Sequence, residues 1–505
     1  MTDAPSPPPA RGFLGHPAGL STLFFTELWE RFSYYGMRAL LLLFLVDQVV
    51  HGGLGIDDRT ATAIYGLYTA SVYISAMPGG WVADRLLGAQ AAVFWGGVLI
   101  TLGHVVLAVA GSSGIFMVGL GVIVLGTGLL KPNASALVGE LYPEGGARRD
   151  SAFTLYYMAI NIGATLGPLI TAWLALRYGW PVGFLAAAVG MSAGLLYYWR
   201  TRSRLGAAGR APGGDSEGAR RRDWLFLWAG LALLLVFASL LWAGTLHVSP
   251  VALRGGAMYV IVGLAAGYFA YLLLFAGLST IERRRVVVLL VLVLASAAFW
   301  AGYEQAGSSL NLFAERHTDR LVGSLTIPAG WFQAVPSAFV ILLAPAMAWL
   351  WVALDARGRD LSVIAKFAFG LVGMALGFLV MVGAAKALGA SGSAGPMWLV
   401  LTYLLHTIGE LALSPVGMSA TTRLAPRRFS GQAMGIWFTS IAMGNLLASR
   451  LAGSLEGADA GGMARYFGSM FWFGIGAALL LLLTLPLLRR WADPRSDATP
   501  HRPGQ

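Results

Sequence analysis

The sequence predicts an all-α membrane protein with two six-helix bundles and two accessory transmembrane helices, fourteen spans in all. Three observations predict this class: the composition, the number of long apolar segments, and one polar break between them. Of the 505 residues, 57% are hydrophobic and 12% are charged, whereas a soluble domain has about 45–50% apolar and about 25% charged residues. So much apolar surface excludes soluble enzymes, nucleic-acid-binding proteins and disordered chains. The basic residues also do not indicate nucleic-acid binding, because they are scattered over short loops rather than gathered in one patch.

Fourteen segments of the sequence are long and apolar enough to cross a bilayer, which takes about 20 mostly apolar residues. Continuous apolar runs such as 286–298 predict helices, because the strands of a transmembrane barrel alternate between apolar and polar residues. The expected spans are 19–47, 60–83, 89–110, 114–138, 151–176, 180–199, 224–246, 253–279, 286–313, 327–353, 362–388, 395–422, 430–454 and 465–488.

The distribution of basic residues predicts the orientation of these spans, since cytoplasmic loops carry an excess of lysine and arginine. With the N-terminus in the cytoplasm, 24 of the 35 lysines and arginines fall on the cytoplasmic side and seven on the outer side. The outer ones are Arg59, Arg177, Arg254, Arg316, Arg320, Lys386 and Arg465, and four more lie within spans: Arg31, Arg38, Lys131 and Arg450. We therefore expect an even number of spans with both termini in the cytoplasm.

One polar stretch interrupts the apolar segments and divides the chain. Residues 201–223 are rich in glycine and arginine and have no apolar period, which is typical of a flexible linker. The expected organisation is a six-helix bundle in 1–200, a cytoplasmic linker in 201–223, two accessory transmembrane helices in 224–279, a second six-helix bundle in 286–490 and a cytoplasmic tail in 491–505. Two such halves predict a binding site near the middle of the membrane.

Four glutamates, Arg31, Arg38 and Lys131 lie well inside the expected spans, and Arg450 lies nearer an outer end. A charge inside a membrane costs about 2.5–3.5 kcal/mol unless it has a partner, a cavity or a function. In the first span, charged and aromatic side chains recur every three or four residues, so they line one face of the helix. They are Glu27, Glu30, Arg31, Tyr34 and Arg38. Such a face indicates a water-filled cavity, and the alternative is a buried lattice of ion pairs that only fixes helix packing.

Lys131, Glu304 and Glu410 are each a single charge in an otherwise apolar stretch. A buried carboxylate beside a movable base can take up and release protons near neutral pH, whereas the alternative is a protonated residue that only packs. We expect no metal and no other cofactor, because the sequence has no cysteine and no histidines at metal-ligand spacing. It has no phosphate-binding loop either, so an ion gradient is expected to drive the protein.

Four motifs carry a resemblance that extends over almost the whole chain. Residues 80–88 (GWVADRLLG) resemble the signature of the major facilitator superfamily between its second and third spans. Residues 27–36 (ELWERFSYYG) resemble the E-x-x-E-R-F-x-Y-Y motif of the proton-dependent oligopeptide transporters within that superfamily, and 153–163 and 409–417 are similar to two further motifs of this family. The resemblance implies the major facilitator fold, and two accessory helices are a feature of the family's bacterial members.

The resemblance also implies a proton-coupled symporter of di- and tripeptides and gives individual residues a role. The peptide site would be lined by Arg31, Tyr34, Tyr35, Tyr73, Lys131, Asn161, Trp300, Glu304, Glu410, Ser414 and Trp437. Lys131 and Asn161 would hold the peptide carboxylate, and Glu410 would hold the amino group. Proton coupling would use Glu27, Glu30, Arg31 and Glu304, and the gates would be the pairs Arg38–Glu304 and Lys131–Glu410.

The chemistry of these side chains agrees with such a substrate. A zwitterionic peptide needs a cation for one end and an anion for the other, and Lys131 and Glu410 lie in opposite halves of the sequence. Tyrosines and tryptophans offer varied side chains a large apolar area with a polar group. We expect a multi-pass monomer in the bacterial cytoplasmic (inner) membrane, with the lipid bilayer, protons and di- and tripeptides as its partners and no nucleic acid.

Two positions depart from the family pattern. Pro336 stands where many relatives have an asparagine that would contact the peptide's amino end. The second span has no histidine, so the histidine of the animal members is absent and the glutamates must carry the coupling.

Other functions remain open at this point. A member of this family could move another small anion or an amino-acid conjugate, and a drug/proton antiporter is a weaker alternative because it needs no fixed cation–anion pair. We expect no enzyme and assign no catalytic residue, because Ser414 has no base and orienting residue near it in the sequence. A channel is disfavoured because the buried charges differ in type and do not form rings of one kind.

Overall fold

The computed structural model describes residues 12–142, 146–210, 217–243, 245–246, 248–359, 361–426 and 429–492. Contacts between residues divide the chain into two compact units. The first unit comprises Met1–Phe44, Gln48–Leu54 and Ile74–Val248, and the second comprises Leu45–Asp47, Gly55–Tyr73 and Ser249–Gln505.

Within the described residues, eleven helices are long and apolar enough to cross a membrane, with mean hydropathies of their most apolar windows between 1.4 and 2.4. The three remaining expected spans are also helical. They are α1 (Ala18–Val46), which carries four charged side chains, α15 (Ser430–Ala452), which is rich in small and polar residues, and the second span, which is broken. Together these helices account for the fourteen segments expected from the sequence.

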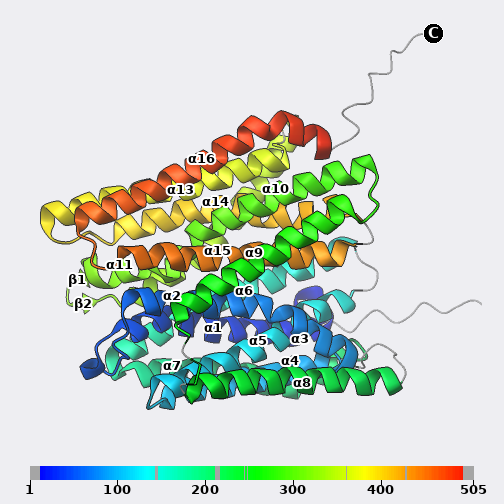
Figure 1. Cartoon of the computed structure of the whole chain (residues 1–505), viewed down its shortest axis with the longest axis horizontal. Helices are drawn as coiled ribbons and strands as arrows, with labels where there is room; N and C mark the ends of the chain where they lie inside the picture. Colours follow the sequence, from blue (N-terminus) through cyan, green and yellow to red (C-terminus); the bar gives the residue numbers. More distant parts are fainter. Residues whose placement is uncertain are drawn as a thin grey trace, which may run out of the picture. The chain divides into compact units, whose positions relative to one another are not determined.

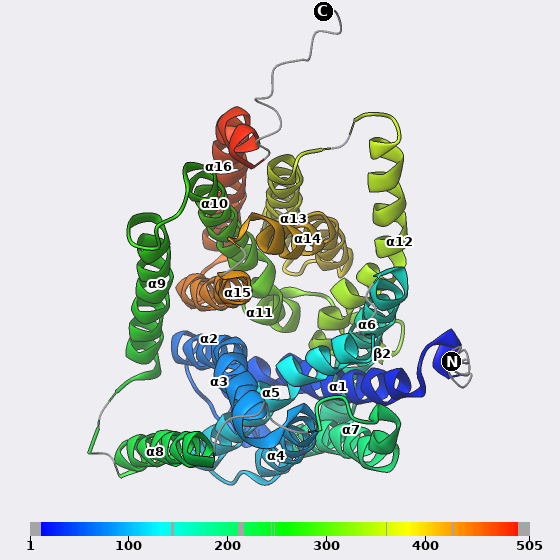
Figure 2. The same ribbon diagram turned by 90° about the vertical axis from the view of Figure 1, so that its right-hand side faces the viewer.

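Among its described residues, the first unit contains α1 as far as Phe44 and six further helices. These are α3 (Ala76–Val82), α4 (Ala89–Val109), α5 (Ser113–Glu140), α6 (Gly146–Tyr178), α7 (Trp180–Thr201) and α8 (Glu217–Trp242), with short helical turns at Phe13–Gly15, Val49–His51, Ala83–Leu87 and Arg202–Leu205. Helix α4 packs against α5 and α7 (Figures 1 and 2). Gly96 and Gly126 allow the close α4–α5 contact, because a methyl group at either would lie 2.7 Å from the other's carbonyl oxygen.

The second expected span, 60–83, is two helices rather than one. Helix α2 (Asp58–Ile74) and α3 are separated at Ser75. Pro78 explains the break, because a proline lacks the N–H that would bond the carbonyl four residues earlier, and its ring crowds that carbonyl, here that of Ile74. The boundary between the two units lies at the same place, since the chain belongs to the second unit as far as Tyr73 and to the first from Ile74.

The second unit contains α2 to Tyr73, α15 and seven further helices. These are α9 (Pro250–Leu274), α10 (Thr280–Tyr303), α11 (Ser309–His317), α12 (Val335–Asp355), α13 (Val363–Ser391), α14 (Met397–Leu424) and α16 (Ala460–Ala492), with short turns at Glu304–Gly307, Ala329–Ala334 and Gly453–Leu455. A two-stranded antiparallel hairpin pairs β1 (Leu321–Val322) with β2 (Leu325–Thr326). Helix α13 runs beside α14 and α16 (Figures 1 and 2). Its Gly370 packs closely on Gly409 of α14, because a methyl group at Gly370 would lie 2.9 Å from the carbonyl oxygen of Gly409, and one at Gly409 would lie 2.6 Å from that of Gly370.

The expected span 286–313 is interrupted as well. Helix α10 ends at Tyr303, residues 304–307 form a 3-10 turn, and α11 begins at Ser309. Polar side chains meet at this interruption: Gln305 Oε1 accepts hydrogen bonds from the hydroxyls of Ser309 at 2.5 Å and Tyr466 at 2.6 Å. Gln305 Nε2 also donates to the carbonyl of Ala301 at 3.4 Å, and such side-chain bonds to backbone carbonyls compete with the regular helical pattern. Glu304 therefore lies at a break in the span rather than inside a continuous helix.

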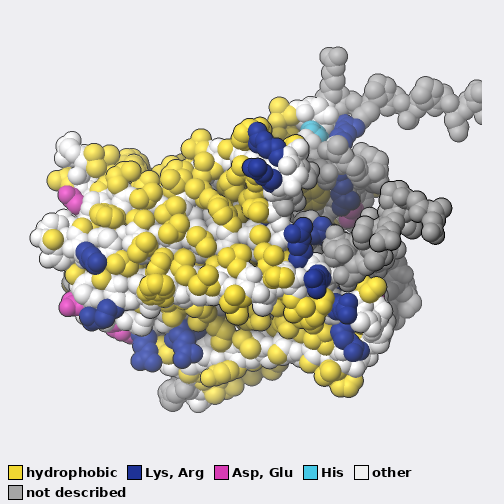
Figure 3. All heavy atoms as spheres, turned by 90° about the horizontal axis from the view of Figure 1, so that it is seen from above, with side chains coloured by type: hydrophobic (Ala, Val, Ile, Leu, Met, Phe, Trp, Pro, Cys, Tyr) yellow, Lys and Arg dark blue, Asp and Glu magenta, His cyan; other side chains and the backbone are white. Residues whose placement is uncertain are grey.

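The two accessory helices present mostly apolar, exposed surfaces. In α8, no residue of the most apolar window is buried, and in α9 only 22% of that window is buried. Figure 3 shows one face of the molecule, on which hydrophobic side chains cover the middle and the lysines and arginines gather towards the two ends. An apolar band bordered by basic side chains is what a lipid bilayer and its headgroups require.

Candidate functional site

The residues predicted to bind substrate and protons fall into two groups, one in each unit. The first unit holds Glu27, Glu30, Arg31, Tyr34, Tyr35, Arg38, Lys131 and Asn161. The second unit holds Tyr73, Trp300, Glu304, Glu410, Ser414 and Trp437. The gate pairs Arg38–Glu304 and Lys131–Glu410 each join a residue of one unit to a residue of the other, and both stay predictions.

Arg31 lies beside two buried carboxylates on α1. Its Nε and Nη2 are both 2.8 Å from Oε1 of Glu27, and its Nε is 3.2 Å from Oε2 of Glu30. Both glutamates are fully buried and Arg31 is 6% exposed. Glu27 and Arg31 meet because residues four apart in a helix lie on the same face. The local sequence therefore places one guanidinium between two acids inside the protein.

Tyr156 of α6 completes the surroundings of Glu27, although it was not among the residues predicted for the site. Its hydroxyl donates a hydrogen bond of 2.5 Å to Oε2 of Glu27, and the side chain is buried. The sequence held one signal for it, since Tyr156 lies in the motif 153–163.

The two glutamates differ in the donors that reach them. Glu27 receives Arg31 at one oxygen and Tyr156 at the other, whereas Glu30 accepts no hydrogen bond from any described residue and has only its ion pair with Arg31. Lys131 of α5 is near enough to Glu30 to interact with it electrostatically. A buried carboxylate without hydrogen bonds is kept ionised only by nearby cations.

Gly163 of α6 allows this helix to pack closely on α1, beside Arg31. A methyl group at Gly163 would lie 2.9 Å from both Arg31 Cβ and the backbone nitrogen of Phe32, so the missing side chain lets α6 lie directly against α1. Two residues earlier, Asn161 is buried and donates one hydrogen bond to the carbonyl of Tyr157, at 2.9 Å. A side-chain amide has two N–H donors, so the second is available to an acceptor.

Further along α1, the aromatic residues and Arg38 form a compact stack. The rings of Tyr34 and Tyr35 meet edge to face with centroids 5.1 Å apart, and the guanidinium carbon of Arg38 lies 5.7 Å from the centroid of Tyr35. This distance is within the range of a cation–π contact. Both Tyr34 and Arg38 are buried.

In the second unit, the structure brings Glu304 and Glu410 near one another. The hydroxyl of Tyr303 donates a hydrogen bond of 2.5 Å to Oε2 of Glu410. Glu304 follows Tyr303 at the break after α10, is buried, and interacts electrostatically with Glu410 of α14. Tyr303 was not predicted as a site residue, and only its position beside Glu304 pointed to it.

Two polar atoms of this group lack a partner among the described residues. They are Nε1 of Trp300 and Oγ of Ser414. The Trp300 ring packs edge to face on Tyr303, with centroids 5.2 Å apart. A buried donor that makes no hydrogen bond costs free energy, so both atoms would gain from a polar molecule bound beside them.

Three other positions are occupied by packing contacts. Trp437 is 2% exposed and its ring covers Gly417 of α14, while Tyr73 packs against a cluster formed by α2, α9 and α15. Contact of either residue with substrate stays a prediction. Pro336 lies in the first turn of α12, where a proline fits because the N–H groups of a first turn have no helical partner.

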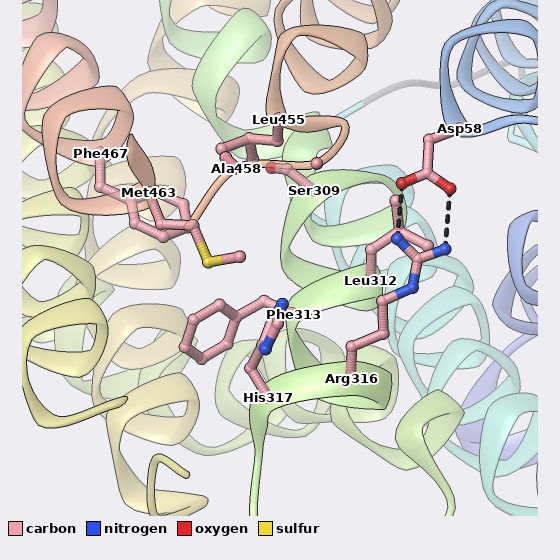
Figure 4. A pocket seen from close by; sticks show the side chains of 11 residues that line it. Asp58, Ser309, Leu312, Phe313, Arg316, His317, Leu455, Ala458, Met463 and Phe467 are labelled. Atoms are coloured by element: carbon pink, nitrogen blue, oxygen red, sulfur yellow. Dashed lines mark hydrogen bonds and ion pairs between the residues drawn. The ribbon is translucent and has the colours of Figure 1, made fainter. Parts of the chain in front are cut away.

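A separate cavity of about 280 Å³ lies in the second unit (Figure 4). Two hydrogen bonds of 2.5 and 2.7 Å join Arg316 to Asp58 on one side of it. Phe313, Met463 and Phe467 contribute apolar surface. No residue predicted for substrate binding lines this cavity, so it is distinct from the group around Glu410.

Comparison with known proteins decides the family. The sequence model described as the POT family matches residues 90–466. The chain belongs to this family. The peptide transporter YePEPT of Yersinia enterocolitica is 40% identical to it, over 99% of this chain and 100% of its own. A di-/tripeptide transporter of Lactococcus lactis is 34% identical over 96% and 98% of the two chains, and dipeptide and tripeptide permease A of Escherichia coli is 31% identical over 94% and 93%.

Solved structures of POT family members have the same fold. A crystal structure described as peptide transporter POT in complex with sulfate matches with a TM-score of 0.89 and 39% identity, over 96% of this chain and 97% of its own. A POT family transporter in complex with 5-aminolevulinic acid matches with a TM-score of 0.87 and 32% identity, over 95% and 98%. The predicted family and the predicted all-α fold of the major facilitator superfamily are confirmed, and the chain is a multi-pass integral membrane protein from a family of transporters.

Proposed function

We propose that this POT family member is a proton-coupled symporter that imports di- and tripeptides by alternating access. The observation that carries the proposal is the unequal surroundings of Glu27 and Glu30. One arginine serves both buried carboxylates, and only Glu27 has a further donor. Glu30 is therefore the carboxylate whose charge depends on cations that can move.

Proton uptake at Glu30 would change what the cations around it can bind. While Glu30 is ionised, it attracts both Arg31 and Lys131. Once Glu30 is protonated, Lys131 loses an anionic neighbour and can attract the carboxylate of a peptide. This difference in interaction between the two protonation states is what a coupled transporter needs in order to shift between conformations.

The side chains of the two groups match the two ends of a peptide. Lys131 and the second amide N–H of Asn161, which no described residue accepts, supply contacts for a carboxylate, and Glu410 supplies an anion for an amino group. Trp300 and Ser414 offer to the peptide backbone polar atoms that have no partner among the described residues. Relatives that match nearly the whole chain are named peptide and di-/tripeptide transporters.

Alternating access would use the pairs Arg38–Glu304 and Lys131–Glu410 as gates. Protonation of Glu304 would remove the charge that attracts Arg38 and release that gate. We further propose that the protein acts as a monomer in the bacterial cytoplasmic membrane with both termini inside, because most basic residues then face the cytoplasm.

One alternative substrate has support from a specific observation. A POT family transporter has been crystallised with 5-aminolevulinic acid, which has an amino group and a carboxylate but no peptide bond. An amino acid derivative of this kind would satisfy Lys131 and Glu410 equally well. Competition experiments with dialanine and 5-aminolevulinic acid separate the two substrate classes.

The proposed function is tested by uptake of labelled dialanine into proteoliposomes with an inward-directed proton gradient. We expect accumulation that an uncoupler abolishes. Glu304→Gln keeps the shape of the protonated side chain, so it should lose accumulation but retain exchange of labelled for unlabelled peptide. Glu315→Gln is the matched control, because Glu315 lies on α11 and its ion pair with Arg320 is partly exposed.

Three results would contradict the proposal. They are accumulation that persists with the uncoupler, accumulation that depends on sodium, and normal proton-driven accumulation in a stable Glu304→Gln protein. A loss of accumulation and exchange together, with a lower melting temperature, would mean that Glu304 serves packing and not coupling.

A further inference from the structure

Three arginines of the second unit converge on the end of α15, away from the residues predicted to bind substrate. Arg450 lies in the last turn of α15, Arg254 near the start of α9, and Arg59 is the second residue of α2. They come from three helices that share one apolar cluster, in which Ala70 and Ile261 pack against α15.

Contacts at the end of α15 define the positions of these side chains. Arg254 is 7% exposed, and its Nη1 donates a hydrogen bond of 3.1 Å to the carbonyl of Ser449. Arg59 lies against Gly453, since a methyl group there would be 3.6 Å from Arg59 Cγ. Arg254 interacts electrostatically with both Arg59 and Arg450.

Within the described parts of the chain, none of the three arginines forms an ion pair with an acidic side chain. The acids that precede Arg59 are engaged elsewhere: Asp58 binds Arg316, and Asp57 accepts the backbone N–H of Thr60 at the start of α2.

The carbonyl end of α15 compensates for only part of this charge. A helix carries roughly half a negative charge at its C-terminus, which suits Arg450 and the Arg254 hydrogen bond to Ser449. Three guanidinium groups carry more positive charge than the helix end can balance. The repulsion between them is stronger for a side chain as buried as Arg254. An anion between them would remove the repulsion, and guanidinium groups bind phosphate with paired, charge-assisted hydrogen bonds.

We propose that Arg59, Arg254 and Arg450 form a binding site for a phosphate group. The surroundings allow two sources for it. Helix α9 exposes Tyr259, Val260 and Leu264, which are 78%, 60% and 68% exposed, so the acyl chains of an anionic phospholipid could lie along α9 while its headgroup reached the arginines. Basic pockets between transmembrane helices bind anionic headgroups in this way. Inorganic phosphate is the other source.

Native mass spectrometry of the purified full-length transporter tests the proposal with phosphatidylglycerol, and phosphatidylcholine serves as the reference lipid. We expect wild-type protein to bind phosphatidylglycerol in preference to phosphatidylcholine. Arg254→Gln should weaken that binding by about ten-fold, the equivalent of about 1.4 kcal/mol. Arg177→Gln is the matched control, because Arg177 is an exposed arginine at the end of α6 in the first unit.

A second variant and a second probe make the result decisive. Arg450→Gln changes an exposed side chain, so its effect on phosphatidylglycerol binding cannot be attributed to loss of the buried Arg254–Ser449 hydrogen bond. Titration with inorganic phosphate identifies the source of the phosphate group. If phosphate raises the melting temperature of the wild type but not of Arg254→Gln, the site binds free phosphate. The proposal would be overturned if the wild type bound the two lipids equally and if phosphate bound equally to the wild type and to the two variants.

Discussion

Replacing Tyr303 by phenylalanine removes one hydroxyl group from the second unit and leaves the aromatic ring in place. That hydroxyl donates the 2.5 Å hydrogen bond to Oε2 of Glu410. If Glu410 binds the amino group of the peptide, Tyr303 fixes the orientation of the carboxylate. We therefore expect Tyr303→Phe to weaken the binding of peptides with a free amino end.

The size of the effect follows from the charge on the acceptor. A hydrogen bond to a charged group contributes about 1.5–3 kcal/mol, which corresponds to roughly ten-fold to 150-fold in an equilibrium constant. Tyr303 and Glu410 are both only partly buried, so water can replace some of the lost interaction. The lower end, about ten-fold, is the expected loss of affinity for dialanine.

The assay is competition against labelled dialanine during exchange in proteoliposomes, with dialanine and N-acetyl-dialanine as competitors. The penalty for acetylation should be large in the wild type and smaller in Tyr303→Phe. Tyr466→Phe is the matched control, because it removes a hydrogen bond of 2.6 Å in the same unit, to the neutral amide of Gln305. It should lower thermal stability and leave the acetylation penalty unchanged. The same penalty in Tyr303→Phe and wild type, or equal losses of affinity in both variants, would refute the reasoning.

Two further predictions concern stability. Gly417→Ala should destabilise the protein by about 1–3 kcal/mol, because the new methyl group would overlap the ring of Trp437. Thermal unfolding in detergent measures this loss. Gly476→Ala is the control and should have almost no effect, because its methyl group would meet nothing within 4 Å. A double-mutant cycle of Asp58→Asn with Arg316→Gln should give a coupling free energy of about 1 kcal/mol or less, because this ion pair is partly exposed. The coupling should decrease as salt is added. Strictly additive effects of the two substitutions would mean that the ion pair contributes nothing to stability.

The sequence predicted the helical class because long apolar runs report directly on the membrane, but it did not locate the breaks. Prolines alone do not mark them. Pro132 lies inside α5, which continues past it, whereas Pro78 coincides with the interruption at Ser75. Next to Pro78, Gly79 of α3 packs so closely on Gly128 of α5 that no side chain fits between them, and the sequence does not reveal such a tertiary contact.

The same limit applies to the site. The contact of Glu27 with Arg31 could be predicted, because residues four apart share a helix face. The donor to the second oxygen of Glu27 could not, because Tyr156 lies 129 residues away in the sequence and reaches it only through tertiary packing. The inequality between Glu27 and Glu30, on which the proposed coupling rests, is therefore a property of the folded chain rather than of the motif.

The interruption at Ser75 has a mechanical consequence. On the C-terminal side of Ser75, α3 packs closely on α5. The Ser75 hydroxyl itself donates a 3.1 Å hydrogen bond to the carbonyl of Val124 in α5. On the N-terminal side of Ser75, α2 packs with α9 and α15. One span thus contributes residues to both units, and the chain passes from the second unit to the first between Tyr73 and Ile74. Pro78 removes a backbone hydrogen bond close to this point, which lowers the bending stiffness of the span there.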